Sequence, residues 1–300
     1  QGDINRYKKY QMSANIKDKE DIEFPYRIST ITAIAKLNSL VNLENLYFII
    51  EEDEDKKIYY NNNGKKEYID LISFIEYGKT KNVSNSKGFN PKTKKITYKK
   101  KLKNSKRFDN QLTLILNLDD NFINMKLFKN GRIQMTGLKN IKNGEIVIQK
   151  MIDIIINLNF NNNIIEKNDL TFENYKICLI NSDFKFGSKL KRNKLFEYLI
   201  NNTDLICSYE PCIYPGVKIQ FFYNEDLDGI CKCENGFCSN KNKKSNCTKI
   251  TVAVFESGCT IITGAKSLEQ INVTYKYIKD FLINNINHFK KIDLDQLLLK

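Results

Sequence analysis

Apolar and polar residues alternate along much of the chain, and this alternation predicts β-strands. Residues 111–118 read QLTLILNL, with a leucine at every second position, and residues 122–128 and 132–137 also alternate. Asn-Gly at 130–131 favours a tight turn, so the last two segments are expected to form a hairpin. Residues 144–160 are strongly apolar except on one side, which predicts a helix packed on these strands.

The same order of elements recurs in the second half of the chain. Near the N-terminus, an apolar segment at 27–37 predicts a strand that leads into a helix at 38–50. In the second half, strands are expected at 175–186, 216–223, 249–255 and 259–264, and helices at 189–202 and 267–289. Each half therefore reads as strand, helix, antiparallel strands and helix.

Two segments 127 residues apart carry the same motif. MKLFKNGRIQMTGLK at 125–139 and VAVFESGCTIITGAK at 252–266 share Phe, Gly, Thr-Gly and Lys at identical spacing. The matched pairs are Phe128 and Phe255, Gly131 and Gly258, Thr136 and Thr263, Gly137 and Gly264, and Lys139 and Lys266. An internal repeat of this kind predicts two copies of one supersecondary unit.

The net charge of +13 over 300 residues indicates an anionic partner, with nucleic acid favoured over an acidic membrane surface. The alternative is the compositional bias of a Lys- and Asn-rich proteome. Residues 91–107 carry nine Lys and Arg and no acid, which predicts a loop able to contact phosphates. A single histidine, His288, excludes Ser-His-Asp and multi-His metal chemistry. Neither a signal core nor a membrane-spanning run is present in the sequence, so an intracellular protein with reduced thiols is expected.

Four cysteines lie within CKCENGFCSNKNKKSNC at 231–247. They are Cys231, Cys233, Cys238 and Cys247, and four thiolates suit a closed tetrahedral zinc site. A loop this polar has no core of its own, and a metal would order it. We therefore predict one structural Zn²⁺ and no catalytic cofactor. The alternative is a loop of free or oxidised thiols.

SYEPCIYPG at 208–216, followed by FESGCTIITGAK at 255–266, resembles the second repeat of the TATA-box-binding protein family. That repeat carries S-Y-E-P-x-x-F-P-G and then I-F-x-S-G-x-x-x-x-T-G-A-K. KRF at 106–108 matches the first family repeat, and the resemblance covers roughly residues 24–160 and 170–290.

The resemblance implies an α+β fold: a pseudo-two-fold saddle of two repeats, with a curved antiparallel sheet and helices on its convex face. Aligning the first strands on Ile28 and Asn181 places about 47 extra residues in the first copy. The expected units are an N-terminal tail (1–23), the first repeat (24–160), the second repeat (170–290) and a C-terminal tail (291–300), with a stirrup-loop insertion at about 51–106 and a Cys-rich loop insertion at 224–247.

In this family, pairs of Phe side chains push between base steps from the minor groove and kink the duplex. The positions that match here are Phe108 with Phe128, and Tyr214 with Phe255. Further DNA-contacting positions implied by the resemblance and by strand alternation are Ile28, Thr30, Lys126, Arg132, Gln134, Thr136, Lys139, Ile261, Thr263 and Lys266. Each family repeat also supplies a central Asn, and the matching positions hold Tyr26 and Leu179.

The function implied is that of a general transcription initiation factor that binds and bends AT-rich promoter DNA. Glu210 and Ile213 match positions that contact a transcription factor IIB-like protein, and RNA polymerase would follow. The alternative is a non-catalytic assembly scaffold with weak or lost sequence-specific DNA binding, which the polar Lys126 and Gln134 favour. The residues supply neither paired carboxylates nor a nucleophile with a base, so no enzyme is expected.

Neither a membrane nor a small-molecule substrate is an expected partner of the chain. The resemblance is to versions of the family carried by large DNA viruses or divergent protists. The nucleus or a cytoplasmic viral factory is therefore the expected location.

Overall fold

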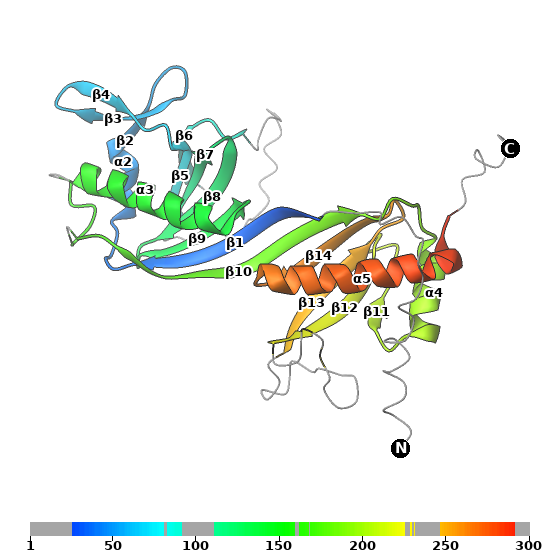
Figure 1. Cartoon of the computed structure of the whole chain (residues 1–300). Helices are drawn as coiled ribbons and strands as arrows, with labels where there is room; N and C mark the ends of the chain where they lie inside the picture. The colour runs from blue at the N-terminus through cyan, green and yellow to red at the C-terminus, as the bar shows by residue number, and fades with distance from the viewer. Residues whose placement is uncertain are drawn as a thin grey trace.

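The structure is dominated by one eleven-stranded antiparallel sheet, with a separate three-stranded sheet beside it (Figure 1). The computed structural model describes residues 26–80, 83–91, 111–159, 162–167, 169–225, 229, 231 and 247–291. The predicted α+β fold, a curved antiparallel sheet built from two repeats with helices on one face, is confirmed.

Each repeat contains two helices and five strands of the main sheet. In the first repeat these are β1 (Arg27–Leu37), α2 (Leu43–Ile49), β5 (Ile72–Thr80), β7 (Gln111–Leu118), β8 (Asn121–Phe128), β9 (Arg132–Leu138) and α3 (Ile141–Asn159). In the second they are β10 (Phe172–Lys185), α4 (Arg192–Asn202), β11 (Ile206–Ser208), β12 (Val217–Asn224), β13 (Cys247–Val254), β14 (Cys259–Ala265) and α5 (Leu268–Phe289). The first repeat adds β2 (Ile50–Glu52), β3 (Ile58–Asn62), β4 (Lys65–Tyr68) and β6 (Val83–Gly88).

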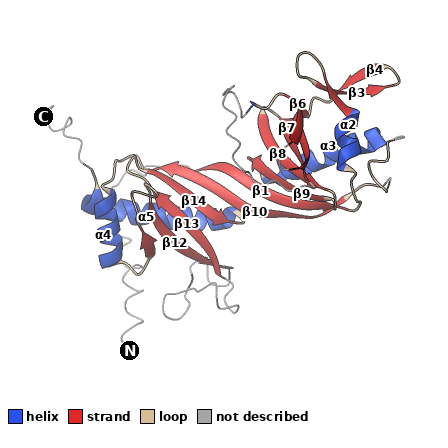
Figure 2. Cartoon of the chain, turned by 180° about the vertical axis from the view of Figure 1, so that it is seen from behind, coloured by secondary structure: helices blue, strands red, loops and turns tan. Residues whose placement is uncertain are grey.

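The strand order of the main sheet is symmetric about its centre apart from β6, an extra edge strand of the first repeat. β1 and β10 pair there, and the order outward is β14, β13, β12 and β11 on one side and β9, β8, β7, β5 and β6 on the other. The helices α3 and α5 lie on the same face, and the view from behind shows the strands in front of them (Figure 2). A single sheet therefore runs through both repeats.

The strand register repeats as well as the strand order. Lys126 of β8 lies opposite Gln134 of β9, and Ala253 of β13 lies opposite Ile261 of β14. Both residues of the second pair are 127 positions beyond those of the first. The repeated motif thus marks two structurally equivalent hairpins.

The first strands are related by a different offset from the one that the sequence suggests. Ile34 of β1 pairs with Gln134, and Asp183 of β10 pairs with Ile261, so Ile34 and Asp183 are equivalent and 149 residues apart. The alignment of Ile28 with Asn181 is therefore wrong by four residues. These strands share no motif, and the β1–β10 pairing contains register shifts that composition does not reveal.

The glycine that both hairpins share has a steric reason. Gly131 and Gly258 have φ values of +78° and +79°, in the left-handed region that favours glycine. A Cβ on Gly131 would also lie 2.6 Å from the carbonyl oxygen of Ser39, and one on Gly258 would lie 2.4 Å from that of Ser188. The chain returns close to each turn in both repeats, which leaves no room for a side chain.

The segment predicted to be a stirrup-loop insertion, at about 51–106, contains regular strands in its described part, and one of them, β5, belongs to the repeated unit. Residues 50–68 form the three-stranded sheet, and β5 pairs with β7 as β11 pairs with β12. β5 lacks a simple alternation because a register shift between Ile72 and Phe74 puts the buried Ile72 and Ile75 three residues apart. The strand could not be found from period-two alternation.

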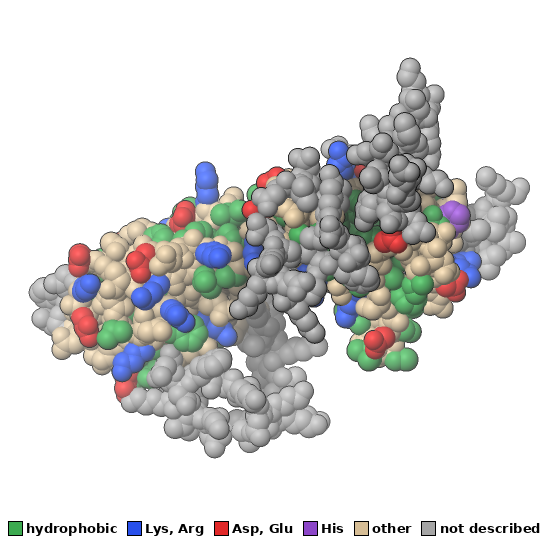
Figure 3. All heavy atoms as spheres, turned by 90° about the horizontal axis from the view of Figure 1, so that it is seen from below, with side chains coloured by type: hydrophobic (Ala, Val, Ile, Leu, Met, Phe, Trp, Pro, Cys, Tyr) green, Lys and Arg blue, Asp and Glu red, His purple; other side chains and the backbone are tan. Residues whose placement is uncertain are grey.

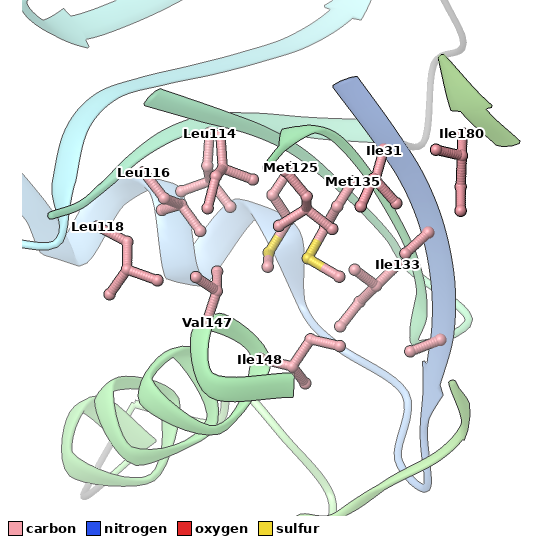
Figure 4. Packing of buried hydrophobic residues seen from close by; sticks show 14 of the residues in the cluster. Ile31, Leu114, Leu116, Leu118, Met125, Ile133, Met135, Val147, Ile148 and Ile180 are labelled. Carbon is pink, nitrogen blue, oxygen red and sulfur yellow. The ribbon is translucent and has the colours of Figure 1, made fainter. Parts of the chain in front are cut away.

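The helices pack on the apolar side of the sheet. In the first repeat, Leu114, Met125 and Met135 point toward Val147 and Ile148 of α3 (Figure 4). Each of these side chains is almost fully buried, and burial of one such side chain contributes about 1.5–3 kcal/mol. The buried core of the second repeat includes Ile250, Val252, Ile262, Ile271, Ile278 and Leu282. Within the described part of the chain, none of the helices has the length and apolar character needed to cross a membrane.

Candidate nucleic-acid interface

The face of the main sheet opposite α3 and α5 carries the side chains that alternate with the buried core. We call it the open face. In β8, Met125 and Leu127 are buried toward α3, whereas Asn124, Lys126 and Phe128 are only half-buried and project the other way. The same alternation continues in β9 and β14, whereas the last three residues of β13, Val252, Ala253 and Val254, are all buried.

Most of the strand residues predicted to contact DNA lie on this face. In the first repeat they are Phe128, Lys126, Gln134 and Thr136, together with the exposed Arg132 at the start of β9. In the second repeat they are Ile261 and Thr263 of β14 and Phe255, which directly follows β13. Phe108 lies outside the described residues, as does the basic segment from residue 92 to 107.

The second aromatic pair comes together although its members are far apart in sequence. The rings of Tyr214 and Phe255 are 5.7 Å apart between centroids, at 60°. Lys218 Nζ lies 4.5 Å from the centroid of the Tyr214 ring. A Cβ on Gly216 would lie 2.9 Å from Tyr214 Cε1 and 3.2 Å from Phe255 Cε1, so this glycine allows the two rings to approach the backbone.

Two residues near the centre of the sheet do not lie where they were expected. Ile28 is opposite the buried Ser182 and packs against the core, because the register shift between Ile28 and Thr30 reverses the facing of the strand. Tyr26 also faces the helices, with its ring 5.1 Å from that of Tyr275 in α5. The assignment of Ile28 to the DNA-facing set is therefore wrong, and Tyr26 does not occupy a central position on the open face.

The centre of the open face is instead built from hydroxyl and amide groups. Thr30 lies opposite Asn181, and the Thr263 hydroxyl donates to Asn181 Oδ1 at 2.5 Å. Thr30 Oγ1 accepts a hydrogen bond from the Gly137 amide at 3.0 Å. Leu179, the other position matched to a family Asn, lies opposite a threonine of β1 in the same region. Asn181 is equivalent to Thr32, so this central amide is present in one repeat only.

The basic residues after the last strand of each repeat differ in their contacts. The Lys139 ammonium donates to the backbone carbonyl of Ser29, close to the junction of the repeats. Lys266 is exposed. In the view of Figure 3, basic and acidic side chains are interspersed over the described surface rather than gathered by sign.

Further residues on the open face were not identified from the sequence. Asn124 and Phe122 continue the alternation of Lys126 by two and four residues, so extending that pattern would have found them. Asp183 is also on this face and pairs with Arg27, with 2.7 Å between its Oδ2 and the arginine Nε. The sequence does not predict that Asp183 lies on this face, because it does not reveal the correct alignment of β10 with β1.

The segment predicted to bind a protein partner lies at the surface. Ile213 is 79% exposed and Glu210 is also exposed. The carbonyl of Glu210 accepts hydrogen bonds from the amides of Ile213 and Tyr214, both at 2.9 Å. The carboxylate is therefore carried on a closed turn that leaves the side chains accessible.

Two of the four clustered cysteines are described, and they lie together. The sulfur atoms of Cys231 and Cys247 are 3.3 Å apart, and the side-chain amide of Asn224 donates to Cys247 Sγ at 3.2 Å. Two thiolates on one tetrahedral zinc would be about 3.8 Å apart, so these two sulfur atoms lie closer together than two ligands of one metal would. Cys233 and Cys238 lie outside the described residues, and within the described part no three metal-ligating side chains gather.

Comparisons with known proteins relate the chain to one group. No family model matches it. It is 28% identical over 295 residues to the TATA-box-binding protein-like protein of Acanthamoeba polyphaga mimivirus, an alignment that covers 91% of this chain and 69% of that protein. It is 24% identical over 161 residues to TATA-box-binding protein 2 of Entamoeba histolytica, covering 53% of this chain and 58% of that protein.

A third relative and one solved structure have similar names. The chain is 26% identical over 187 residues to TATA-box-binding protein-like 1 of Entamoeba histolytica, covering 62% of this chain and 68% of that protein. The solved structure of the Methanococcus jannaschii TBP superposes with a TM-score of 0.45 at 18% identity, covering 86% of this chain and 98% of that one.

Proposed function

This chain is a divergent TATA-box-binding-protein-like protein, and from that premise we propose that it binds and bends duplex DNA with its open face. The observation that supports this most directly is the placement of Phe128 and Phe255 at equivalent ends of two symmetric hairpins. The backbone of a DNA duplex has approximate two-fold symmetry, which relates one half of a binding site to the other. Two equivalent aromatic side chains could therefore contact the two halves in the same way.

In this proposal the aromatic side chains enter base steps from the minor groove. Unstacking one step costs a few kcal/mol, and the kinked duplex then contacts more of the sheet. Tyr214 and Phe255 would act together at one end of the site, and Phe128 would act at the other. Flexible pyrimidine–purine steps such as TA are easiest to kink, which favours AT-rich sites.

The groove floor would be read unequally by the two repeats. The equivalent pairs are Lys126 with Gln134, and Ala253 with Ile261. The apolar pair excludes the guanine amino group that distinguishes G·C from A·T in the minor groove. The polar pair can instead approach acceptors or phosphates, so we propose weaker exclusion of G·C by the first repeat.

We propose that the exposed turn with Glu210 and Ile213 contacts a transcription factor IIB-like protein, which would bring RNA polymerase to the bent promoter. The support is the match of SYEPCIYPG to the family motif and the exposure of both side chains. A chain with this role would act in the nucleus or in a cytoplasmic viral factory.

We also propose one structural Zn²⁺ held by Cys231, Cys233, Cys238 and Cys247. The support is that Cys231 and Cys247 are brought together from the two ends of the Cys-rich segment, and that Asn224 supplies a hydrogen bond to one of these sulfurs. When bound, the metal would close the long connection between β12 and β13. Four thiolates leave no open coordination position, so the role is structural.

A second candidate is a non-catalytic scaffold that keeps the fold and has weak or lost sequence-specific DNA binding. The polar pair Lys126 and Gln134 and the turning of Tyr26 toward α5 favour it. The DNA-bending function predicts a preference for AT-rich duplexes, whereas the scaffold predicts weak binding or no sequence preference.

A titration by fluorescence anisotropy separates these candidates. The full chain is mixed with labelled duplexes, one set AT-rich with TA steps and one set G·C-rich, at several salt concentrations. The DNA-bending function predicts tighter binding of the AT-rich set at every salt concentration. A salt-dependent affinity that is equal for both sets would contradict it and support the scaffold.

A further inference from the structure

One arginine contacts both segments that carry the second aromatic pair. Arg192, the first residue of α4, donates from Nη1 to the carbonyl oxygen of Pro215 at 2.7 Å. Its Nη2 lies 3.1 Å from Glu256 Oε2. Pro215 directly follows Tyr214 and Glu256 directly follows Phe255, so a single guanidinium bridges the residues next to the two aromatic side chains.

Other groups hold this arginine and its acidic partner in place. Lys291 Nζ lies 2.5 Å from Glu256 Oε1, and the guanidinium carbon of Arg192 is 5.7 Å from the Tyr209 ring centroid. The hydrogen bond and charge of Lys291, and then the charge of Arg192, hold the pKa of Glu256 below its usual value. The carboxylate is therefore ionised near neutral pH and available to both cations.

The first repeat lacks this arrangement although its backbone is the same. The amide of Leu190 donates to the carbonyl of Glu256 at 2.8 Å, and at the equivalent place the amide of Val41 donates to the carbonyl of Lys129 at 2.9 Å. The offsets of 149 and 127 make Leu43 the counterpart of Arg192, and Lys129 that of Glu256. Leu43 is buried and has no charge, and Lys129 is positive where Glu256 is negative. The ion pair therefore has no counterpart in the first repeat.

We infer that Arg192 is a positioning residue that fixes Tyr214 and Phe255 against each other before DNA is met. Its partners Glu256 and Lys291 hold the guanidinium in the bridging position. This inference rests on the proposed function, because the aromatic pair matters only if it enters DNA. If the two side chains are already ordered in the free protein, the conformational entropy of ordering them is not lost when DNA binds.

The contact between the two rings has a consequence for the tyrosine at this position. Because the Tyr214 ring lies against both Gly216 and the Phe255 ring, the two aromatic side chains would meet DNA as one unit. The second repeat would therefore be the preformed half of the site, and the first repeat would lack this clamp.

The test uses amide hydrogen exchange in the absence of DNA. The Tyr214 amide donates to Glu210 and the Phe255 amide donates to Cys259, so their exchange reports the order of the two segments. Arg192→Met removes the guanidinium and retains an unbranched stem, and Glu256→Gln removes only the charge. We expect about tenfold faster exchange of both amides in Arg192→Met, the size of one lost charged hydrogen bond, and a smaller change in Glu256→Gln.

The symmetric position supplies the control, since Lys129→Met should leave these amides unchanged. Bending of a labelled AT-rich duplex is measured on the same proteins, and Arg192→Met should reduce it. Unchanged amide exchange in Arg192→Met would overturn the inference, and lost bending with unchanged exchange would mean that Arg192 binds phosphate directly. Faster exchange together with a wild-type protein that does not bend DNA would support the clamp and overturn the proposed function.

Discussion

Tyr26 and Tyr175 occupy equivalent positions 149 residues apart, and each packs against the long helix of the other repeat. The Tyr26 hydroxyl donates to the side chain of Asn272 in α5. The Tyr175 hydroxyl donates to the carbonyl of Ile141 in α3 at 2.7 Å. Each long helix is therefore hydrogen-bonded to a tyrosine in, or directly before, the first strand of the other repeat, and these reciprocal contacts oppose rotation of one repeat against the other.

Replacing Tyr175 by Phe should change stability in a pH-dependent way. Burial, and then the charge of Glu145, raises the pKa of Tyr175 to about 12. At pH 8 the variant loses one hydrogen bond and should be about 1 kcal/mol less stable. Above pH 10 the unfolded wild type ionises at this residue while the folded state does not, so the wild type loses stability that Tyr175→Phe retains.

Urea unfolding at pH 8, 9.5, 10.5 and 11 measures this difference. The free-energy gap between wild type and Tyr175→Phe should narrow above pH ~10, because other tyrosines and lysines titrate equally in both proteins. A gap that is constant with pH would show that the Tyr175 hydroxyl ionises as freely in the folded state as in the unfolded one.

The pair Lys126 and Gln134 can be exchanged for its counterpart in the second repeat. The double variant Lys126→Ala and Gln134→Ile should deepen A·T preference on the half-site met by the first repeat, by about 1 kcal/mol per base pair. Selection from random duplexes measures the preference of each half. The reverse exchange, Ala253→Lys with Ile261→Gln, should flatten the other half, and a wild-type motif that is equally deep on both halves would refute the assignment.

The sequence was most informative where both repeats carry the same motif. The hairpins of β8 with β9 and β13 with β14 could be predicted, because Gly131 and Gly258 meet the same steric limit and apolar and polar residues alternate regularly in β8 and β9. The first strands could not be aligned, since register shifts in the β1–β10 pairing change which side chains face the core. That change is the reason Ile28 was assigned to the wrong face.

Contacts between segments far apart in the chain could not be predicted from the sequence either. Nothing in the spacing of Arg192, Pro215 and Glu256 indicates that they meet, because the contact depends on how α4 and two loops pack at one end of the sheet. The proposal that Tyr214 and Phe255 act as wedges depends on the family motif alone.

The proposed zinc site predicts a fixed metal content. Purified protein should contain one zinc per chain by elemental analysis, and Cys247→Ser should lose it because a three-thiolate site binds more weakly. The matched control is Cys212→Ser, since Cys212 is an exposed cysteine outside the cluster and should retain full zinc. Metal-free wild-type protein purified without chelators would end the zinc proposal.

The proposed partner site predicts a loss of binding without a loss of fold. Glu210→Arg should weaken capture of a transcription factor IIB-like protein about tenfold or more, because it reverses a charge on an accessible turn. Glu197→Arg on α4 is the control, since Glu197 is exposed and pairs only with Lys194 among the described contacts. Equal capture by Glu210→Arg and wild type would exclude this turn as the docking site.

The most direct test of the account is the bend angle of DNA measured by energy transfer between dyes at the ends of an AT-rich duplex. Phe128→Ala and Phe255→Ala should each reduce the bend, and the double variant should remove most of it, because the kinks depend on inserted rings. Phe48→Ala is the control, since Phe48 is 59% exposed on α2 and should leave the bend unchanged. A double variant that binds and bends the duplex as the wild type does would contradict the proposal that these residues are wedges.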